Sequence, residues 1–322
     1  MNEKVSYGII SPAFIAPRFC GGMQQTANGH IVAVSSRSIE KAGAFARDNG
    51  IARFYGDWRE MLKDEEIAAV YIPLINSLHY PVALEALKAG KHVVLEKPFV
   101  LHGWQGRELL NEAQKRNLFV TEAVKTPYLP VMKELRKMIA DGRFGKLQYM
   151  TFRQSYTSGH YGKGWKKQKE YGGGALYANE AYFLTMAEYF GGRITGISGQ
   201  GSYGVHDVDD QFAVTLKTEN DVLAVSLMST NVLFENGMTL YLDKARIEVP
   251  DYWKSREAFI HPNNGPAEKL EFPCKHEFMY ELQHFNECIL SGLTQSPVTP
   301  VTDSIRRIEM CEELYRQWES RR

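Results

Sequence analysis

The sequence predicts an α/β protein in which a doubly wound parallel sheet is followed by an α+β part with a mainly antiparallel sheet. From Val5 to Thr121, short β-branched runs alternate with helical stretches, a pattern typical of βαβ units. Beyond Thr121 the alternation stops, and strands follow one another directly. The chain of 322 residues is also long for one hydrophobic core, because single domains rarely exceed roughly 250–300 residues. We therefore expect two domains, at residues 1–122 and 123–322.

Capping and turn residues mark the ends of the N-terminal elements. Ser38 precedes a helical run, Asp57 is followed three residues later by Glu60 in a capping-box pattern, and Gly90 follows the end of a helix. The predicted strands are 5–10, 30–36, 69–72 and 92–96, and the predicted helices include 16–25, 38–49 and 78–89. Parallel strands joined by such helices form a sheet that is covered on both faces.

The C-terminal part is predicted to begin with a helix at about 130–141 and a long strand at 147–156. A loop rich in lysine, glycine and tyrosine then leads to a helix opened by Gly172-Gly173-Gly174. Strands are expected at 194–203, 211–218, 222–230, 238–242 and 246–249, separated by turn residues as in an antiparallel sheet. Two helices, near 277–290 and 301–319, close the chain.

The composition favours a globular protein that acts on small molecules. Hydrophobic residues make up 44% and charged residues 24% of the chain, so there is enough apolar material for packed cores. Lysine plus arginine and aspartate plus glutamate both count 38, and no net charge therefore draws the protein to nucleic acid or to an anionic membrane.

Cysteine usage and the lack of targeting signals predict a cytoplasmic protein. Cys20, Cys274, Cys288 and Cys311 form no CxxC pair, which favours free thiols over a zinc site or a disulfide framework. The first residues enter a strand-like run without the charged and apolar regions of a signal peptide. The longest apolar runs, such as 67–75, are far shorter than the ~20 residues of a membrane-spanning helix.

The connection between the first strand and the first helix is the position of the phosphate-binding turn in a dinucleotide fold. In such turns three glycines let the backbone approach a pyrophosphate, but here Ser11, Ala13 and Ala16 stand at those positions. The segment predicts a cofactor turn made by Ser11, Ala13, Phe14 and Ile15 or, alternatively, a plain strand-turn-helix connection.

Ser36 and Arg37 follow the second strand, where an NAD-preferring site places an acid for the ribose 2′-hydroxyl. A hydroxyl beside a planar cation suits a 2′-phosphate instead, and this favours NADP over NAD. The alternative is that Arg37 is a solvated residue at a strand end.

Several sequence blocks, in order along the chain, resemble one oxidoreductase family. They are VAVSSRSIEKAGAFA, AVYIPLINSLHYPVALEALKAGKHVVLEKP, GGGAL, HFNECILSG and SPVTP. On these blocks the sequence resembles the glucose-fructose oxidoreductase, inositol dehydrogenase and rhizopine-catabolism (Gfo/Idh/MocA) family nearly from end to end. The resemblance implies an N-terminal Rossmann domain, a C-terminal domain that completes the substrate site, and a nicotinamide cofactor at the domain junction.

The resemblance places Lys97, within Glu96-Lys97-Pro98, beside the reacting carbon. It also implies a cis peptide bond before Pro98, a form tolerated mainly at X-Pro bonds. Cofactor contacts are implied for Asn76, His79, Glu96, Lys97, Trp165 and Lys166. The chain's own pattern agrees, because Lys97 follows a strand at the edge where open α/β sheets bind ligands.

The sequence departs from the family at several positions. Ile75 stands where proline is frequent, and Lys166 where arginine is common. The helix after the three glycines usually carries an aspartate and, four residues later, a histidine, whereas this chain has Ala178 and Tyr182. Tyrosine there resembles dimeric dihydrodiol dehydrogenases and some xylose dehydrogenases, which use lysine and tyrosine for proton transfer. The resemblance therefore implies proton transfer by Lys97 and Tyr182, with simple packing of Tyr182 as the alternative.

Two further patterns admit a functional and a structural explanation. The loop 156–171 interleaves aromatic residues with lysines, as single-stranded nucleic acid sites do, but the neutral net charge favours a lid over cofactor phosphates and a polar substrate. Its members are Tyr156, Tyr161, Lys163, Trp165, Lys166, Lys167, Lys169 and Tyr171. The run His206 to Asp210 resembles metal ligands, yet an Asp-rich turn before a strand explains it more simply. We therefore expect neither nucleic acid nor metal as a partner.

The leading hypothesis is reversible hydride transfer between NADP or NAD and a sugar, sugar derivative, polyol or dihydrodiol. One alternative is a catalytically silent nucleotide-binding sensor, suggested by the degenerate glycine turn. Another is a Rossmann reductase of the biliverdin or amino-acid type. An exposed face of the antiparallel sheet, common in the family, predicts a homodimer.

Overall fold

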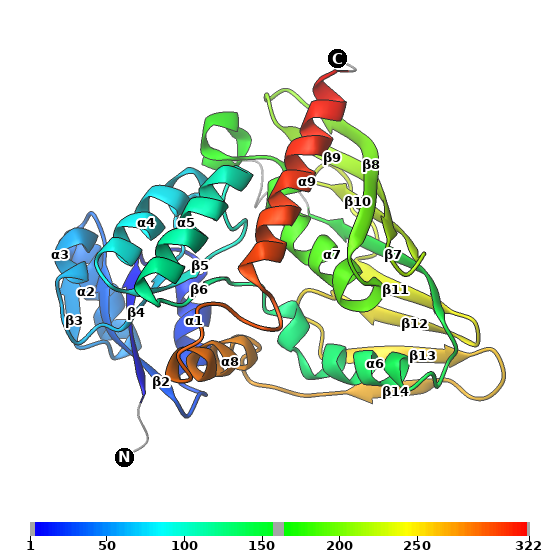
Figure 1. The fold of residues 1–322 in the computed structure, drawn as a ribbon, viewed down its shortest axis with the longest axis horizontal. Coiled ribbons are helices and arrows are strands. Elements are labelled where there is room, and N and C mark those ends of the chain that lie inside the picture. The colour runs from blue at the N-terminus through cyan, green and yellow to red at the C-terminus, as the bar shows by residue number, and fades with distance from the viewer. Residues whose placement is uncertain (1–3, 157–163, 321–322) are drawn as a thin grey trace. The chain divides into compact units, whose positions relative to one another are not determined.

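The computed structural model describes residues 4–156 and 164–320, which form two compact units (Figure 1). The first unit contains the chain up to Val124 and the segment Lys275–Ile308, and the second contains Lys125–Cys274 and the chain from Glu309. The compact units are therefore not two contiguous stretches, because residues 275–308 rejoin the first unit. The domain boundary expected at residue 122 stays a prediction.

Six parallel strands form the sheet of the first unit, in the order β3-β2-β1-β4-β5-β6. They are β1 (Val5–Ile10), β2 (Gly29–Ser35), β3 (Arg53–Tyr55), β4 (Ala69–Ile72), β5 (His92–Leu95) and β6 (Val120–Glu122). The winding direction reverses between β1 and β4, which is the Rossmann arrangement and its switch point. The predicted doubly wound parallel sheet is confirmed.

Helices connect these strands and cover the sheet (Figure 1). They are α1 (Ala16–Met23), α2 (Ile39–Asn49), α3 (Trp58–Leu62), the 3₁₀ turn η1 (Asn76–Leu78), α4 (His79–Lys88), α5 (Gly103–Arg116) and, later in the chain, α8 (Phe278–Leu290). α4 packs against α5, and α8 packs against α1. A Cβ atom on Gly22 of α1 would lie 2.6 Å from Cβ of Phe278, so the glycine permits this close approach. The α1–α8 contact ties the late segment to the first unit.

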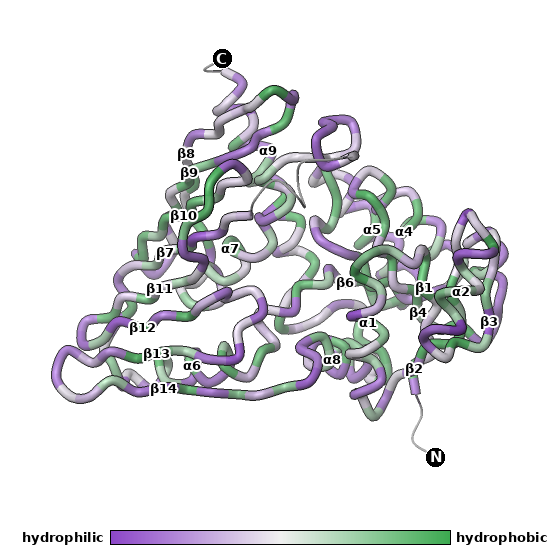
Figure 2. Tube along the Cα trace, turned by 180° about the vertical axis from the view of Figure 1, so that it is seen from behind, coloured by the Kyte–Doolittle hydropathy of each residue, from purple (hydrophilic) through white to green (hydrophobic). Residues whose placement is uncertain are grey.

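The strands of this sheet are hydrophobic and buried. All residues of β4 and β6 are buried, as expected where helices cover both faces of a parallel sheet. Figure 2 shows hydrophobic stretches among these strands. Burying one valine or isoleucine side chain contributes about 1.5–3 kcal/mol to folding stability. These short strands are therefore stable, and they fix the positions of the residues that follow them.

Eight strands form the sheet of the second unit, in the order β14-β13-β12-β11-β7-β10-β9-β8. They are β7 (Leu147–Ser155), β8 (Ile194–Tyr203), β9 (Asp209–Thr218), β10 (Leu223–Ser229), β11 (Gly237–Leu242), β12 (Ala245–Pro250), β13 (Glu257–Pro262) and β14 (Glu268–Glu271). Among the described strands, β7 and β10 pair in parallel and the other neighbours pair antiparallel. The predicted mainly antiparallel sheet is confirmed.

One long helix, α7 (Ala175–Gly191), packs on β7 to β10 of this sheet. The other helical elements are η2 (Thr126–Tyr128), α6 (Pro130–Ala140), η3 (Gly164–Lys167), η4 (Lys169–Tyr171) and α9 (Val301–Glu319), of which α9 begins in the first unit and ends in the second. Buried and exposed residues alternate along much of β9, so the sheet has a covered face and a face open to solvent.

The sequence patterns do not predict β3, β13 or β14. β14 reads EKLE and has no clear hydrophobic alternation. It is a strand because it pairs with β13 and because Lys269 forms ion pairs with Glu257 and Glu271. Charged edge strands of this kind are common in proteins, and their stability depends on neighbours that periodicity cannot reveal.

Two predicted helix caps are confirmed, and one capping box is not. Ser38 and Asp57 precede α2 and α3, and each accepts a hydrogen bond from a main-chain N–H of its helix. Glu60, the expected second member of a capping box, pairs instead with Lys63 (2.8 Å). The exposed carboxylate reaches a nearby ammonium rather than the helix terminus.

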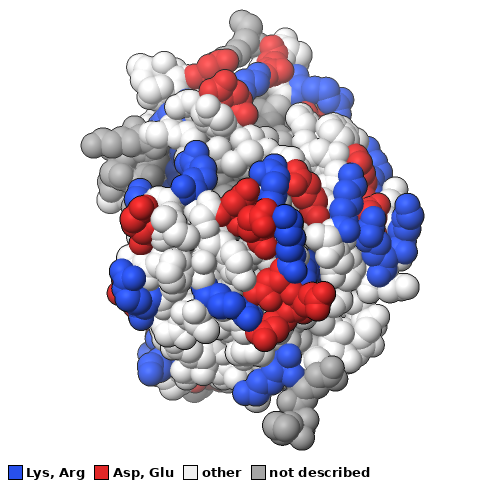
Figure 3. Space-filling model, turned by 90° about the vertical axis from the view of Figure 1, so that its left-hand side faces the viewer, with Lys and Arg blue, Asp and Glu red and all other residues white. Residues whose placement is uncertain are grey.

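Charges of both signs mix on the surface drawn in Figure 3, where Lys and Arg side chains lie among Asp and Glu. None of the described helices is long and apolar enough to cross a membrane. All four cysteines are free, and Cys20, Cys288 and Cys311 are buried.

Candidate active site

The turn after β1 contains one residue with a positive φ although it lacks the glycines of a dinucleotide-binding turn. Ser11 has a φ of 93°, a conformation that glycine adopts most easily, and its N–H donates to the carbonyl of Ser35 (3.0 Å). Ala13 and Ile15 are half-buried, and Phe14 is 81% exposed. The first turn of α1 contains no acidic residue that would repel a phosphate. The four predicted cofactor contacts in this turn stay proposals.

Ser36 and Arg37 lie directly beyond β2, at the same edge of the sheet. The N–H of Ser36 donates to the carbonyl of Tyr55 (3.0 Å), and its hydroxyl accepts from the N–H of Ser38 (3.3 Å). Arg37 is exposed. An exposed guanidinium beside a fixed hydroxyl has the chemistry to bind a phosphate, and the preference for NADP remains a proposal.

Glu96, Lys97 and Pro98 follow β5 at this edge as well. The hydroxyl of Tyr71 donates to Oε1 of Glu96 (2.6 Å), and the N–H of Lys97 donates to Oε2 of Glu96 (3.3 Å). The peptide bond between Lys97 and Pro98 is cis, as the family resemblance predicts. Both carboxylate oxygens of Glu96 are therefore engaged by protein groups, one of which is the backbone of Lys97.

His79, the first residue of α4, contacts the same turn. Its ring is fully buried, with Nδ1 2.8 Å from the carbonyl oxygen of Pro98 and Nε2 3.0 Å from that of Leu74. Burial lowers the pKa of His79, although both carbonyls and nearby carboxylates oppose the shift. Each ring nitrogen faces a carbonyl oxygen, which can only accept, so whichever nitrogen carries a proton donates to one of these carbonyls. His79 thus holds the backbone beside Lys97, while its cofactor contact and that of buried Asn76 stay proposals.

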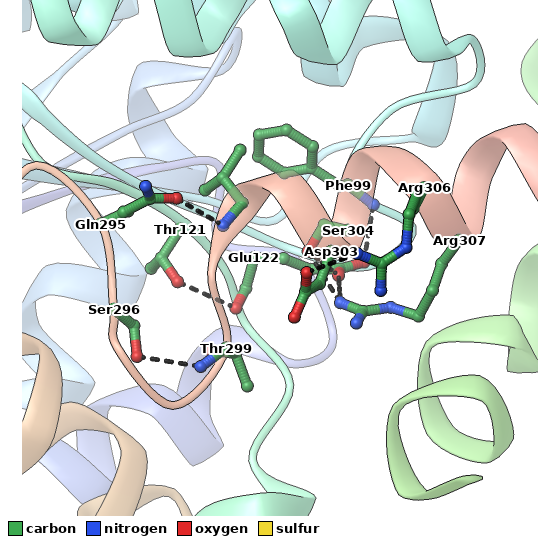
Figure 4. A network of polar contacts seen from close by, with 11 residues as sticks. Phe99, Thr121, Glu122, Gln295, Ser296, Thr299, Asp303, Ser304, Arg306 and Arg307 are labelled. Atoms are coloured by element: carbon green, nitrogen blue, oxygen red, sulfur yellow. Dashed lines mark hydrogen bonds and ion pairs between the residues drawn. The ribbon is translucent and has the colours of Figure 1, made fainter. Parts of the chain in front are cut away.

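Glu122, the last residue of β6, forms hydrogen bonds both with the turn that carries Lys97 and with helix α9 (Figure 4). Its Oε1 accepts the N–H of Phe99 (2.8 Å), and its Oε2 accepts from the hydroxyl of Ser304 (2.7 Å) and from Nη2 of Arg307 (3.2 Å). The side chains of Glu122 and Arg307 are both 2% exposed. A buried ion pair offsets its desolvation only when further hydrogen bonds surround it, as they do here. Lys97 therefore stands in a turn that is tied to β4, α4, β6 and α9.

Trp165 and Lys166 lie in η3 of the second unit, and both are half-buried. A Cβ atom on Gly173 would lie 2.3 Å from the carbonyl oxygen of Lys166, so a glycine is required where this loop meets the start of α7. Tyr161 and Lys163 of the predicted lid lie outside the described residues. The cofactor contacts of Trp165 and Lys166 stay proposals.

Tyr182 and Ala178 are half-buried on α7, where residues four apart share a face as predicted. The ring centroid of Tyr182 lies 6.5 Å from that of Trp253 and 5.4 Å from Nζ of Lys125. The Trp253 ring lies 6.1 Å from that of Tyr156. The second unit thus brings a phenol and an ammonium together with two further aromatic rings. Such a group can contact both the hydroxyls and the apolar face of a ring-shaped molecule.

The acidic run before β9 supports the fold of the second unit. Asp209 accepts the N–H of Leu176 in the first turn of α7 (2.7 Å) and the hydroxyl of Tyr315 (2.8 Å). Burial raises the pKa of Asp209 to about 6, although these hydrogen bonds oppose the shift. Asp210 forms an ion pair with Lys167 of η3. These partners agree with the structural explanation of the run, and no cluster able to hold a metal occurs in the described ranges.

The sequence analysis does not single out Tyr71, Glu122, Arg307 or Lys125. Each is a polar side chain buried in or next to an apolar segment, which signals that a partner must exist, because such groups are rarely buried alone. The partner itself cannot be found this way. Arg307 is 185 residues from Glu122 along the chain, and only the tertiary fold brings them together.

A Rossmann sheet followed by an antiparallel α+β unit is the architecture that the sequence resemblance implies for a nicotinamide-dependent oxidoreductase. Residues 5–124 match the model of an oxidoreductase family with an NAD-binding Rossmann fold, and residues 132–248 match the GFO/IDH/MocA C-terminal domain. The chain belongs to the Gfo/Idh/MocA family and is an NAD(P)-dependent oxidoreductase. The C-terminal match goes against a reductase that shares the Rossmann half alone, and the family is one of enzymes rather than silent sensors.

Relatives of this chain include a diol dehydrogenase and sugar oxidoreductases. The trans-1,2-dihydrobenzene-1,2-diol dehydrogenase of Xenopus laevis is 29% identical over 300 residues, which is 89% of each chain. The solved aldose-aldose oxidoreductase of Caulobacter crescentus, complexed with glycerol, is 23% identical, with a TM-score of 0.89 over 99% of both chains. Levoglucosan dehydrogenase, in complex with NADH and levoglucosan, is 18% identical, with a TM-score of 0.88 over 98% of this chain and 97% of the other. The two structures have the same fold as this chain.

Proposed function

We propose that this protein transfers a hydride reversibly between NADP or NAD and a carbon–hydroxyl group of a sugar, sugar derivative, polyol or dihydrodiol. The observation that carries the proposal is the turn of Lys97, which Glu96, His79 and Glu122 fix at the carboxyl edge of the Rossmann sheet. A lysine whose backbone is held in this way suits proton transfer beside a nicotinamide, since catalytic groups must be held in position by their surroundings. The substrates named for the relatives support the same class of compounds.

Lys97 and Tyr182 share the proton transfer in this proposal. The nicotinamide, when bound, accepts or supplies the hydride. In the oxidising direction the phenolate of Tyr182 accepts the proton of the substrate hydroxyl, and the ammonium of Lys97 donates a hydrogen bond to the same oxygen. In the reducing direction the phenol returns the proton. Ala178, on the same helix face, leaves space for the substrate.

NADP is the proposed preferred cofactor, with NAD as the alternative. The support is the absence of an acid after β2 and the exposed Arg37 beside Ser36. The proposed cofactor contacts are Ser11, Ala13, Phe14, Ile15, Ser36, Arg37, Asn76, His79, Glu96, Lys97, Trp165 and Lys166. The left-handed backbone of Ser11 and the acid-free start of α1 support the pyrophosphate position.

A cytoplasmic homodimer, formed through the open face of the second sheet, is part of the proposal. Leu223 and Leu227 of β10 are 49% and 39% exposed, and the neighbouring rings of Tyr149 and Tyr241 lie 6.2 Å apart across β7 and β11. Exposed apolar residues in register on one sheet face are typical of an interface. Leu227→Asp should convert a dimer to a monomer in sedimentation analysis, and a monomeric wild type would contradict the proposal. The free thiols support the cytoplasmic location.

Two experiments test the catalytic proposal. Cofactor consumption is measured with purified protein on a panel of sugars, polyols and trans-1,2-dihydrobenzene-1,2-diol, with NADP and NAD in parallel. On the best substrate, Tyr182→Phe should lower turnover by roughly 100-fold or more and leave cofactor affinity nearly unchanged. Tyr189→Phe, on the same helix but with its ring against Arg136, is the matched control and should keep its activity. Wild-type turnover in Tyr182→Phe would assign Tyr182 to packing.

A further inference from the structure

Lys125 is a buried lysine that lies against Tyr182 within the second unit. It follows the end of β6 and directly precedes η2, and it is 5% exposed. Its Nζ lies 5.4 Å from the centroid of the Tyr182 ring. An ammonium at this distance from an aromatic ring is attracted to it, more strongly where water is excluded. The contact joins two segments that are far apart in the sequence.

Both members of the pair are held by buried neighbours. The carbonyl of Lys125 accepts the N–H of Tyr128 (3.0 Å), and all three residues of η2 are buried. On α7, Ala181 and Phe183 on either side of Tyr182 are buried, and the ring of Trp253 lies beside that of Tyr182. The position of the ammonium relative to the phenol is therefore a feature of the packed unit and not of a loosely held surface chain.

A nearby cation favours the ionised form of a phenol, and the effect grows as water is excluded. The other charged groups near Tyr182 are a lysine that is paired with a carboxylate and two buried carboxylates. Lys254 lies over the Trp253 ring (5.8 Å) and is paired with Asp251. Glu180, on α7 itself, is buried, and Asp209 of β9 sits at the start of that helix, so both carboxylates would oppose ionisation.

We infer that Lys125 is a positioning residue for Tyr182, whose ammonium stabilises the phenolate and so tunes the tyrosine for proton transfer near neutral pH. The inference rests on the proposed role of Tyr182 in catalysis. It assigns separate tasks to two lysines: Lys97 acts on the substrate oxygen, and Lys125 acts through the phenol. Lys125 should therefore affect the pH at which Tyr182 works more than the binding of substrate.

The direct test is the ionisation of Tyr182, followed by NMR of protein labelled with ¹³C at the tyrosine Cζ. The resonance that disappears in Tyr182→Phe is that of Tyr182. Lys125→Met keeps the length of the side chain and removes its charge, and it should move the titration midpoint of Tyr182 to higher pH by about one unit or more. Lys125→Arg should restore a midpoint close to that of wild type. An unchanged midpoint in folded Lys125→Met would overturn the inference.

A matched control is available on the same sheet. Lys269 of β14 lies 5.7 Å from the Phe259 ring and is paired with Glu257 and Glu271. Lys269→Met thus removes a lysine–aromatic contact of the same kind at the edge of the sheet. It should leave the Tyr182 midpoint and the activity unchanged.

Turnover supplies the second test, on whichever panel compound gives the highest rate. Lys125→Met should lower kcat at neutral pH by about tenfold or more, with little change in KM, and recover activity as the pH rises. In the Tyr182→Phe background the same substitution should have no further effect. Additive losses in the double variant would overturn the inference, because Lys125 would then act independently of the hydroxyl. Wild-type turnover in Tyr182→Phe would instead refute the proposed role of Tyr182 in proton transfer, and the NMR midpoint would still decide whether Lys125 controls the phenol.

Discussion

Replacing Glu122 by leucine would remove the carboxylate that accepts hydrogen bonds from three donors. The N–H of Phe99, the hydroxyl of Ser304 and Nη2 of Arg307 lie 2.8, 2.7 and 3.2 Å from its carboxylate oxygens. Both charged side chains are 2% exposed, so water cannot replace the lost partner without opening the core. The substitution therefore takes the carboxylate away from a buried guanidinium and the acceptor away from an N–H in the turn that carries Lys97.

The cost can be estimated from these contacts. Breaking a buried ion pair by removing one partner costs about 3–5 kcal/mol, because the other charge stays buried without compensation. The unsatisfied N–H of Phe99 adds about 1–3 kcal/mol. Replacing both partners, in Glu122→Leu with Arg307→Met, removes the uncompensated charge and leaves mainly the N–H penalty. The double variant should thus be more stable than Glu122→Leu alone.

Urea unfolding followed by circular dichroism gives the free energy of unfolding for each variant. Arg306→Met is the control on the same helix, because Arg306 pairs with Asp303 in a partly exposed position where such pairs contribute less than about 1 kcal/mol. Two results would refute the reasoning. One is a Glu122→Leu loss as small as that of the control, and the other is a double variant whose loss equals the sum of the two single losses.

Two further predictions concern the cofactor and the pH dependence of stability. Arg37→Ala should weaken NADP binding by roughly 10- to 100-fold and NAD binding little, since a lost charge-assisted hydrogen bond is worth about 1.5–3 kcal/mol; fluorescence titration with each cofactor checks this, and equal weakening would show that Arg37 does not contact the 2′-phosphate. Because burial raises the pKa of Asp209 to about 6, the folded protein binds that proton more tightly than the unfolded chain does. Stability from this group is therefore fully present below about pH 4 and is lost as the pH rises to about 6, by roughly 3 kcal/mol. Asp209→Asn should flatten this part of a plot of melting temperature against pH, and an unchanged slope would assign the dependence to another group.

The local part of the fold could be predicted because its signals are local. Hydrophobic runs, helix caps such as Ser38, and the change from alternating to serial strands all act within a few residues, and they were sufficient for the parallel and antiparallel sheets. The short β3 and the edge strands β13 and β14 were missed because their strand state depends on pairing with neighbours. For the same reason the return of residues 275–308 to the first unit had no local signal.

The candidate site likewise has features that the sequence predicts and features that only the tertiary structure shows. The sequence by itself determined that a lysine follows β5 before a proline, that a serine and an arginine follow β2, and that Ala178 and Tyr182 share a helix face, because each statement needs only residue type and periodicity. Only the tertiary structure decided which groups hold these residues in place. Glu122 meets Arg307 across 185 residues, and Lys125 meets Tyr182 because η2 and α7 pack together. Buried polar groups need hydrogen-bonding partners, and the position of a partner in the sequence cannot be predicted from local residue patterns.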